Sequence, residues 1–103
     1  MAEVLDASSL VEYAKGSVVS RTLIKRDTGS TTVFAFDKGE GLSEHSAPFD
    51  VLVHVLDGEA EIKVGGQPHR VKAGQMILMP AGIPHALRAV ERFKMVLHLA
   101  RAK

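Results

Sequence analysis

His85 is the residue of this sequence best placed for chemistry, because the residues before it predict a rigid support. The apolar run Met76 to Met79 lies between a glycine and a proline, which favours a short strand buried on both faces. Proline fixes its own φ and glycine permits a positive φ, so Pro80-Ala81-Gly82 predicts a tight turn that reverses the chain. Pro84 pushes the residue before it towards an extended conformation. We therefore expect His85 at the start of the next strand, facing a pocket.

The sequence contains few residues or motifs for catalysis or binding that does not use a histidine. The sequence has no cysteine, which excludes disulfides, thiolate catalysis and cysteine metal sites and fits a reducing compartment. No serine lies in a nucleophile-elbow sequence, and no glycine-rich loop has a phosphate-binding pattern. The one tyrosine, Tyr13, precedes the predicted strands and is expected outside their core.

The charge pattern does not favour nucleic acid or a membrane as a binding partner. The net charge is +1 and acidic and basic residues are interspersed, which does not favour nucleic acid or a membrane surface as a partner. The acidic N-terminus does not resemble a signal peptide, and no apolar run reaches membrane-spanning length. We therefore expect a cytoplasmic protein.

The pattern from Ser17 onward is typical of an all-β fold, with short extended runs separated by glycine or proline. The clearest alternation is Glu59 to Val64, and the Asp57-Gly58 and Gly65-Gly66 pairs on either side predict hairpins. Many short strands favour a sandwich or barrel. The predicted strands are Val18 to Lys25, Thr31 to Phe36, Leu42 to His45, Val51 to Leu56, Glu59 to Val64, His69 to Lys72, Met76 to Met79, His85 to Val90 and Phe93 to Ala100.

The chain is long enough for one domain. Its 103 residues are 46% hydrophobic, which supplies one core and not two. We expect a single domain over residues 1–103, with a barrel at about 17–101 and an N-terminal arm over 1–16. Within the arm, serines before a short mixed segment that ends at Gly16 predict a short helical turn with a serine cap.

Two predicted strands are apolar in both parities. Val33 to Phe36 and Val51 to Leu56 would each fill the core with one face and leave the other face to be covered. A second subunit is the simplest cover, which predicts a homodimer. The alternative is a second layer formed by the same chain.

The residues around His85 resemble a known motif. Gly74, Pro80, Gly82 and His85 have the spacing of the second conserved motif of the cupin superfamily, in which Ala89 replaces the final asparagine. The first cupin motif is degenerate here. Gly39, His45 and Gly58 occupy three of its positions, whereas Ala47 and Val51 replace its second histidine and its glutamate.

The resemblance covers about residues 30 to 100 and extends to small single-domain bacterial cupins known as conserved barrel proteins. It implies an RmlC-like jelly-roll β-barrel, commonly a dimer. It implies little about function, because cupins include dioxygenases, isomerases, epimerases, decarboxylases, storage proteins and sugar-sensing domains.

The degenerate motif bears directly on metal binding. Metal-binding cupins hold Fe, Mn, Ni, Zn or Cu with three histidines and often a glutamate. Only His45 and His85 remain here, and neither Ala47 nor Val51 can coordinate a metal. The other histidines offer no third ligand. His54 and His98 have the parity of outward-facing positions, and His69 is expected on the surface.

We therefore expect a small-molecule-binding or sensing barrel without robust catalysis. Its predicted pocket is mostly apolar and comprises His45, Ala47, Val51, Val53, His85, Leu87 and Ala89. Two alternatives stay open. One is a metal-dependent cupin oxygenase or isomerase acting on a small organic acid, phenol or sugar derivative, with one divalent transition metal on His45 and His85. The other is a structural or interaction protein that uses the doubly apolar strands.

Overall fold

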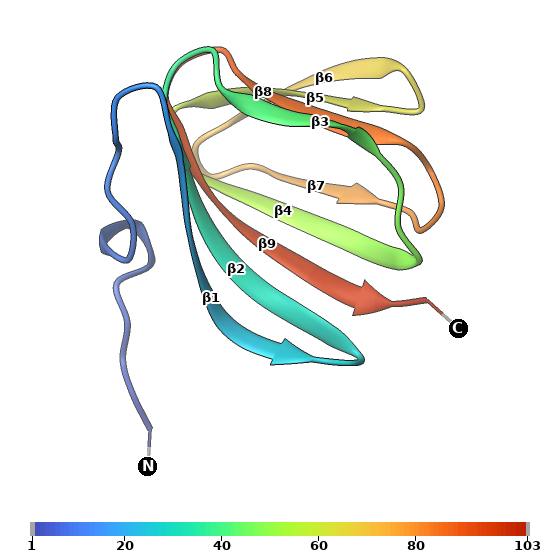
Figure 1. The fold of residues 1–103 in the computed structure, drawn as a ribbon, viewed down its shortest axis with the longest axis horizontal. Helices are drawn as coiled ribbons and strands as arrows, with labels where there is room; N and C mark the ends of the chain where they lie inside the picture. The colour runs from blue at the N-terminus through green and yellow to red at the C-terminus, as the bar shows by residue number, and fades with distance from the viewer. Residues whose placement is uncertain (1, 103) are drawn as a thin grey trace.

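The computed structural model describes residues 2–102 and consists of two antiparallel sheets that face each other, with an N-terminal arm along one side (Figure 1). One sheet has five strands in the order β1-β2-β9-β4-β7, and the other has four in the order β3-β8-β5-β6. The strands are β1 (Val18–Arg26), β2 (Gly29–Phe36), β3 (Gly41–His45), β4 (Phe49–Asp57), β5 (Glu59–Val64), β6 (Gln67–Lys72), β7 (Met76–Met79), β8 (His85–Ala89) and β9 (Phe93–Arg101).

This arrangement confirms the predicted all-β jelly roll. Every predicted strand is present, and the observed ends lie within two residues of the predicted ones. The Gly65-Gly66 turn joins β5 to β6 as an antiparallel hairpin, as expected.

The core lies between the two sheets. In β4, Val51, Val53 and Val55 are buried and alternate with more exposed residues, which is the period of a strand with one face inward. Phe36 of β2 stacks on Phe93 of β9 with ring centroids 4.5 Å apart. Ala60, Ile62, Leu87 and Ala89 close this core from the four-stranded sheet.

The outer face of the five-stranded sheet is covered in part by the chain's own arm. Val11 is buried against Val33 and Ala35 of β2 and Val96 of β9. The outer face of β2 is therefore covered by a second layer of the same chain, which was the alternative to a second subunit. Tyr13 fixes the arm, because its hydroxyl donates a hydrogen bond to the Asp57 carboxylate and the Arg92 guanidinium lies 4.6 Å from its ring centroid. Burial and the neighbouring carboxylate raise the pKa of Tyr13.

Strand β7 corrects the expectation of a strand buried on both faces. It is an edge strand that pairs with β4 alone among residues 2–102. Met79 is fully buried, whereas Met76 and Leu78 are 56% and 68% exposed. A short apolar run cannot distinguish a central strand from an edge strand, because the run carries no information about its neighbours.

The Asp57-Gly58 turn was also predicted wrongly. It does not close a hairpin, because β4 pairs with β9 and β7 whereas β5 pairs with β6 and β8. The turn instead carries the chain from one sheet to the other. Gly58 has a φ of +78°, and a Cβ at this position would overlap the carbonyl oxygen of Arg92.

The short N-terminal turn is present, but it begins before the serines that were expected to cap it. It is a single 3-10 turn over Ala7–Ser9, and Asp6 rather than a serine occupies the N-cap position. Ser8 and Ser9 lie inside the turn and donate their hydroxyls to the Asp6 carboxylate. Among residues 2–102, no helix is both long and apolar enough to cross a membrane.

Candidate functional site

His45 and His85 meet at one end of the space between the sheets. They are direct cross-strand partners on β3 and β8. Their ring centroids lie 4.5 Å apart at an interplanar angle of 67°, which is an edge-to-face contact. His85 is only 5% exposed, whereas His45 is exposed to solvent. The pair therefore extends from the interior to the surface.

A β-bulge in β3 makes this contact possible. Leu42 pairs with Leu87 and His45 pairs with His85, so three steps along β3 match two steps along β8. In a regular strand, residues three apart face opposite sides of the sheet. The extra residue brings Leu42 and His45 to the same face, a use of bulges that is common beside functional sites. The sequence analysis did not predict this bulge, because it is defined by the register between β3 and β8.

The turn before His85 is fixed to the β3–β4 connection and to the start of β4. Gly82 has a φ of +78°, and its N–H donates to the carbonyl of Ala47 at 2.9 Å. The N–H of Ala81 donates to Asp50 Oδ1 at 2.9 Å. The turn runs between the two sheets and holds both histidine-bearing segments in register.

Each imidazole has one nitrogen engaged with the backbone. His45 Nδ1 lies 2.9 Å from the carbonyl oxygen of Ser43, and His85 Nδ1 lies 3.3 Å from that of Ile83. A carbonyl oxygen only accepts hydrogen bonds, so Nδ1 is the donor in both rings. In a neutral ring this leaves Nε2 with a free lone pair.

The Nε2 atom of His85 is not sealed in the core. Among residues 2–102, no side-chain polar atom is both buried and without a hydrogen-bond partner. Since the hydrogen bond of His85 is made by Nδ1, its Nε2 must be reachable from the space beside the ring. Burial lowers the pKa of His85, the hydrogen bond to Ile83 opposes this shift, and the nearby His45 adds to it. The ring is therefore neutral at neutral pH.

Both rings line a cavity between the sheets, which we call the between-sheet cavity. Its volume is about 210 Å³. Five predicted pocket residues line it, namely His45, Ala47, Val51, His85 and Leu87. The other two, Val53 and Ala89, lie deeper in the packed core.

The cavity is also lined by four residues that the sequence analysis did not assign to the pocket. They are Phe34, Leu42, Leu97 and Leu99. Leu97 and Leu99 have the opposite parity to His98, which was expected to face outward. What the sequence could not show was where the core ends and the cavity begins, because that depends on how far apart the sheets stand at the histidine end.

The residues present do not fit the metal centre that the resemblance implies. Ala47 and Val51 lie in the cavity wall beside the two histidines, where neither supplies a ligand. Within residues 2–102, no group of three or more histidine, cysteine, aspartate or glutamate side chains is placed to hold a metal ion. Two imidazoles alone fall short of the three protein ligands of a typical catalytic site.

The remaining histidines lie elsewhere. His54 pairs with Met76 and Val96, on the side of β4 opposite to Val53 and Val55. His98 Nδ1 lies 3.1 Å from the hydroxyl of Thr31 on the neighbouring strand. His69 is exposed on β6.

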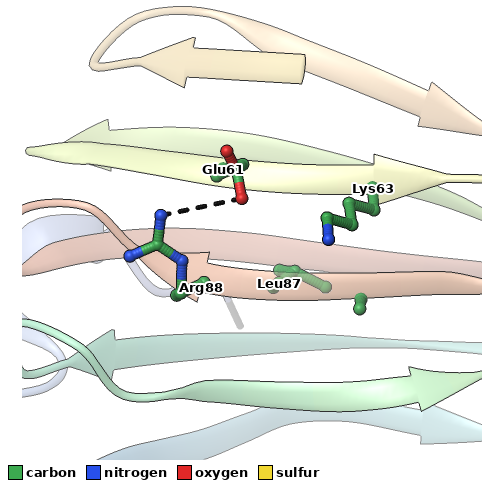
Figure 2. Close-up of a pocket in the computed structure, with 5 residues that line it drawn as sticks. Glu61, Lys63, Leu87 and Arg88 are labelled. Carbon is green, nitrogen blue, oxygen red and sulfur yellow. Dashed lines mark ion pairs between the residues drawn. The ribbon is translucent and has the colours of Figure 1, made fainter. Parts of the chain in front are cut away.

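A second hollow of about 190 Å³ lies on the outer face of the four-stranded sheet, and we call it the outer groove (Figure 2). It is lined by Glu61, Lys63, Ala86, Leu87 and Arg88. Arg88 Nη2 lies 3.6 Å from Glu61 Oε1, and Figure 2 shows the two side chains directed towards each other. Exposed ion pairs of this kind contribute little to stability and are common on sheet surfaces. The outer groove therefore carries no argument for function by itself.

Comparison with known proteins gives concordant matches. The family model described as a cupin domain matches residues 32–99. A crystal structure of a conserved protein of unknown function from Streptococcus pyogenes is 45% identical, with a TM-score of 0.95, over 100% of this chain and 90% of that one. A cupin 2 conserved barrel domain protein from Leptotrichia buccalis is 44% identical, with a TM-score of 0.89, over 91% of this chain and 46% of that one. The protein named polyketide synthase CurC from Streptomyces cyaneus is 30% identical over 94% of this chain and 68% of its own length.

Proposed function

This chain belongs to the cupin family, and from that premise we propose that it is a small-molecule-binding or sensing barrel whose ligand site is the between-sheet cavity. The observation that carries the proposal is an apolar cavity with two imidazoles at one end, each of which has only Nδ1 engaged by the backbone. A few convergent polar groups in an apolar pocket are typical of ligand sites.

The polarity of the wall supports binding rather than simple core packing. Seven of the nine lining residues are apolar and the other two are His45 and His85. A histidine retained only for packing would be expected to have its polar atoms fully engaged by the protein. Here Nε2 of His85 is available to a ligand.

A metal-dependent oxygenase or isomerase is the second candidate. It is favoured by one observation: metal-bound histidines usually donate their other ring nitrogen to a carbonyl or carboxylate, as both rings do here. The donor set opposes it, because the third and fourth positions hold Ala47 and Val51. Elemental analysis of protein purified without chelator separates the two candidates. Near-stoichiometric metal would favour the enzyme.

The names of the relatives specify neither a ligand nor a reaction. The Streptomyces cyaneus relative carries the name polyketide synthase, and the Streptococcus pyogenes structure carries no functional name. We propose that this chain binds a small organic molecule.

We further propose that the chain acts as a homodimer. The support is the uncovered part of the five-stranded sheet, where Met76 and Leu78 of β7 are largely exposed beside the half-buried Leu52 and His54 of β4. Contiguous exposed apolar side chains of this kind are typical of interfaces. The N-terminal arm lies over β2 and β9 instead.

A matched pair of variants tests the ligand site. Ala47→Phe places a large side chain in the cavity wall, whereas Ala86→Phe places the same side chain in the outer groove. In a thermal-shift screen against small metabolites, compounds that stabilise the wild type and Ala86→Phe should not stabilise Ala47→Phe. Equal shifts for both variants, or no shift for the wild type, would contradict the proposal.

A further inference from the structure

We infer that the between-sheet cavity selects neutral single-ring molecules with one hydroxyl group, of which phenol is the simplest, over sugars and over anions of the same size. This inference rests on the proposed function and specifies its ligand class. It is carried by the volume of the cavity, the composition of its wall and the hydrogen-bonding state of His85.

The volume limits the ligand to about one ring. An apolar cavity of about 150 Å³ accommodates benzene. At about 210 Å³, the between-sheet cavity has room for one six-membered ring with a small substituent. Drug-sized ligands generally occupy larger pockets, of about 300 Å³ or more.

The wall excludes polyhydroxylated ligands. Phe34, Leu97 and Leu99 line the cavity from the five-stranded sheet, and Leu42 and Leu87 line it from the other. A sugar would have to lose water from several hydroxyls, and only the two histidines could replace it. Unpaired polar groups in an apolar site are strongly disfavoured.

The wall also excludes anions. Over residues 2–102, no lysine or arginine lines the between-sheet cavity. A carboxylate bound there would lose its hydration without gaining a cation. Lys63 and Arg88 lie on the opposite face of the four-stranded sheet, in the outer groove (Figure 2).

The remaining polar feature is a hydrogen-bond acceptor. His85 donates through Nδ1 to the carbonyl of Ile83, so its Nε2 accepts when the ring is neutral. His45 donates in the same way to the carbonyl of Ser43, so its Nε2 also accepts when that ring is neutral. One ligand hydroxyl can donate its single hydrogen bond to His85 Nε2, and the exposed His45 can accept one from water.

Three probes of similar size test whether the cavity selects a neutral hydroxyl compound over an apolar ring and over an anion. Phenol carries the hydroxyl, toluene lacks it, and benzoate carries a negative charge. In protein labelled with ¹⁵N-histidine at neutral pH, phenol should shift the Nε2 resonance of His85. Toluene should perturb methyl resonances of the cavity wall and leave Nε2 unmoved. Benzoate should bind at least about tenfold more weakly than phenol.

A variant pair gives an independent readout. His85→Leu should weaken phenol binding relative to toluene binding by about fivefold, the size expected for one lost hydrogen bond. His69→Leu, which removes an exposed histidine on β6, should leave that ratio unchanged. The wild-type spectra suffice if His85→Leu does not fold.

The outcomes distinguish this inference from the function on which it rests. If phenol and toluene bind without any response at His85 Nε2, or if benzoate binds most tightly, the ligand class is wrong and the cavity remains a binding site. If none of the three probes binds but other metabolites stabilise the wild type in the thermal-shift screen, the inference fails and the proposed function stands. If nothing binds in either experiment, both fail.

Discussion

His45 and His85 are cross-strand neighbours whose rings meet edge to face with centroids 4.5 Å apart. The contact depends on a bulge in β3 that turns His45 to the cavity face of its sheet. It places two imidazoles at the end of an apolar cavity where Ala47 and Val51 stand in place of further ligands. This geometry underlies the proposal that the cavity holds a small molecule by shape and one polar contact.

The first prediction concerns pH. The pKa of His85 is lowered below its ordinary value of about 6.5, so below that pH the unfolded chain binds a proton that the folded protein does not. The free energy of unfolding should therefore be fully maintained above about pH 6.5 and should fall as pH decreases towards the folded-state pKa. Urea denaturation of the wild type and of His85→Gln between about pH 5 and pH 7.5 measures this.

The His85→Gln variant should lose less stability than the wild type over this interval. His69→Gln, at an exposed position, should behave as the wild type does. A parallel pH dependence in all three proteins would show that His85 is not protected from protonation.

The second prediction concerns the missing metal ligands. Ala47→His with Val51→Glu restores the residues of the first cupin motif, adjacent to His45 and His85 in the cavity wall. Ni²⁺ or Zn²⁺ should stabilise this double variant, by about 2.7 kcal/mol when the free metal is at 100 times its Kd. The wild type should show no comparable stabilisation. Equal stabilisation of both proteins in calorimetry would mean that two histidines already suffice.

The third prediction concerns the turn between the sheets. Gly58→Ala should lower the free energy of unfolding by at least about 3 kcal/mol, because the positive φ is strained for alanine and the new Cβ overlaps the Arg92 carbonyl. Gly66→Ala is the matched control, since Gly66 has a similar φ of +81° but open space around it. It should lose only about 1–2 kcal/mol. Equal losses in chemical denaturation would remove the steric argument.

The fourth prediction concerns the homodimer. Leu78→Lys should shift the protein towards a monomer in sedimentation velocity at micromolar concentration, because it places a charge on the exposed apolar face of β7. Ile24→Lys alters a comparably exposed residue on β1, far along the sheet order, and should leave the assembly unchanged. A wild type that sediments as a monomer would refute the dimer.

The strands were predictable from the sequence because each one is a local pattern. Alternation in Glu59 to Val64 and the punctuation by glycine and proline depend only on neighbouring residues, and the observed strands follow them. The Asp57-Gly58 pair was misread for the opposite reason. Whether a turn closes a hairpin or changes sheets depends on which strands pair at longer range.

The candidate site was predictable only in part. The turn before His85 is local, and its residues were recognised. The bulge that brings His45 to the same face as Leu42 shifts the register between β3 and β8, and it appears only when both strands are seen together. Likewise, the burial of Val33 and Ala35 by Val11 depends on where the arm folds back, which the sequence pattern of the arm does not specify.

The most direct test of the account is a crystal structure of the wild type soaked with phenol. We predict a single ring in the between-sheet cavity, with its hydroxyl within hydrogen-bonding distance of His85 Nε2 and its ring against Phe34, Leu97 and Leu99. A cavity that holds only water under these conditions, with phenol absent or bound elsewhere, would contradict the claim that this space is a ligand site.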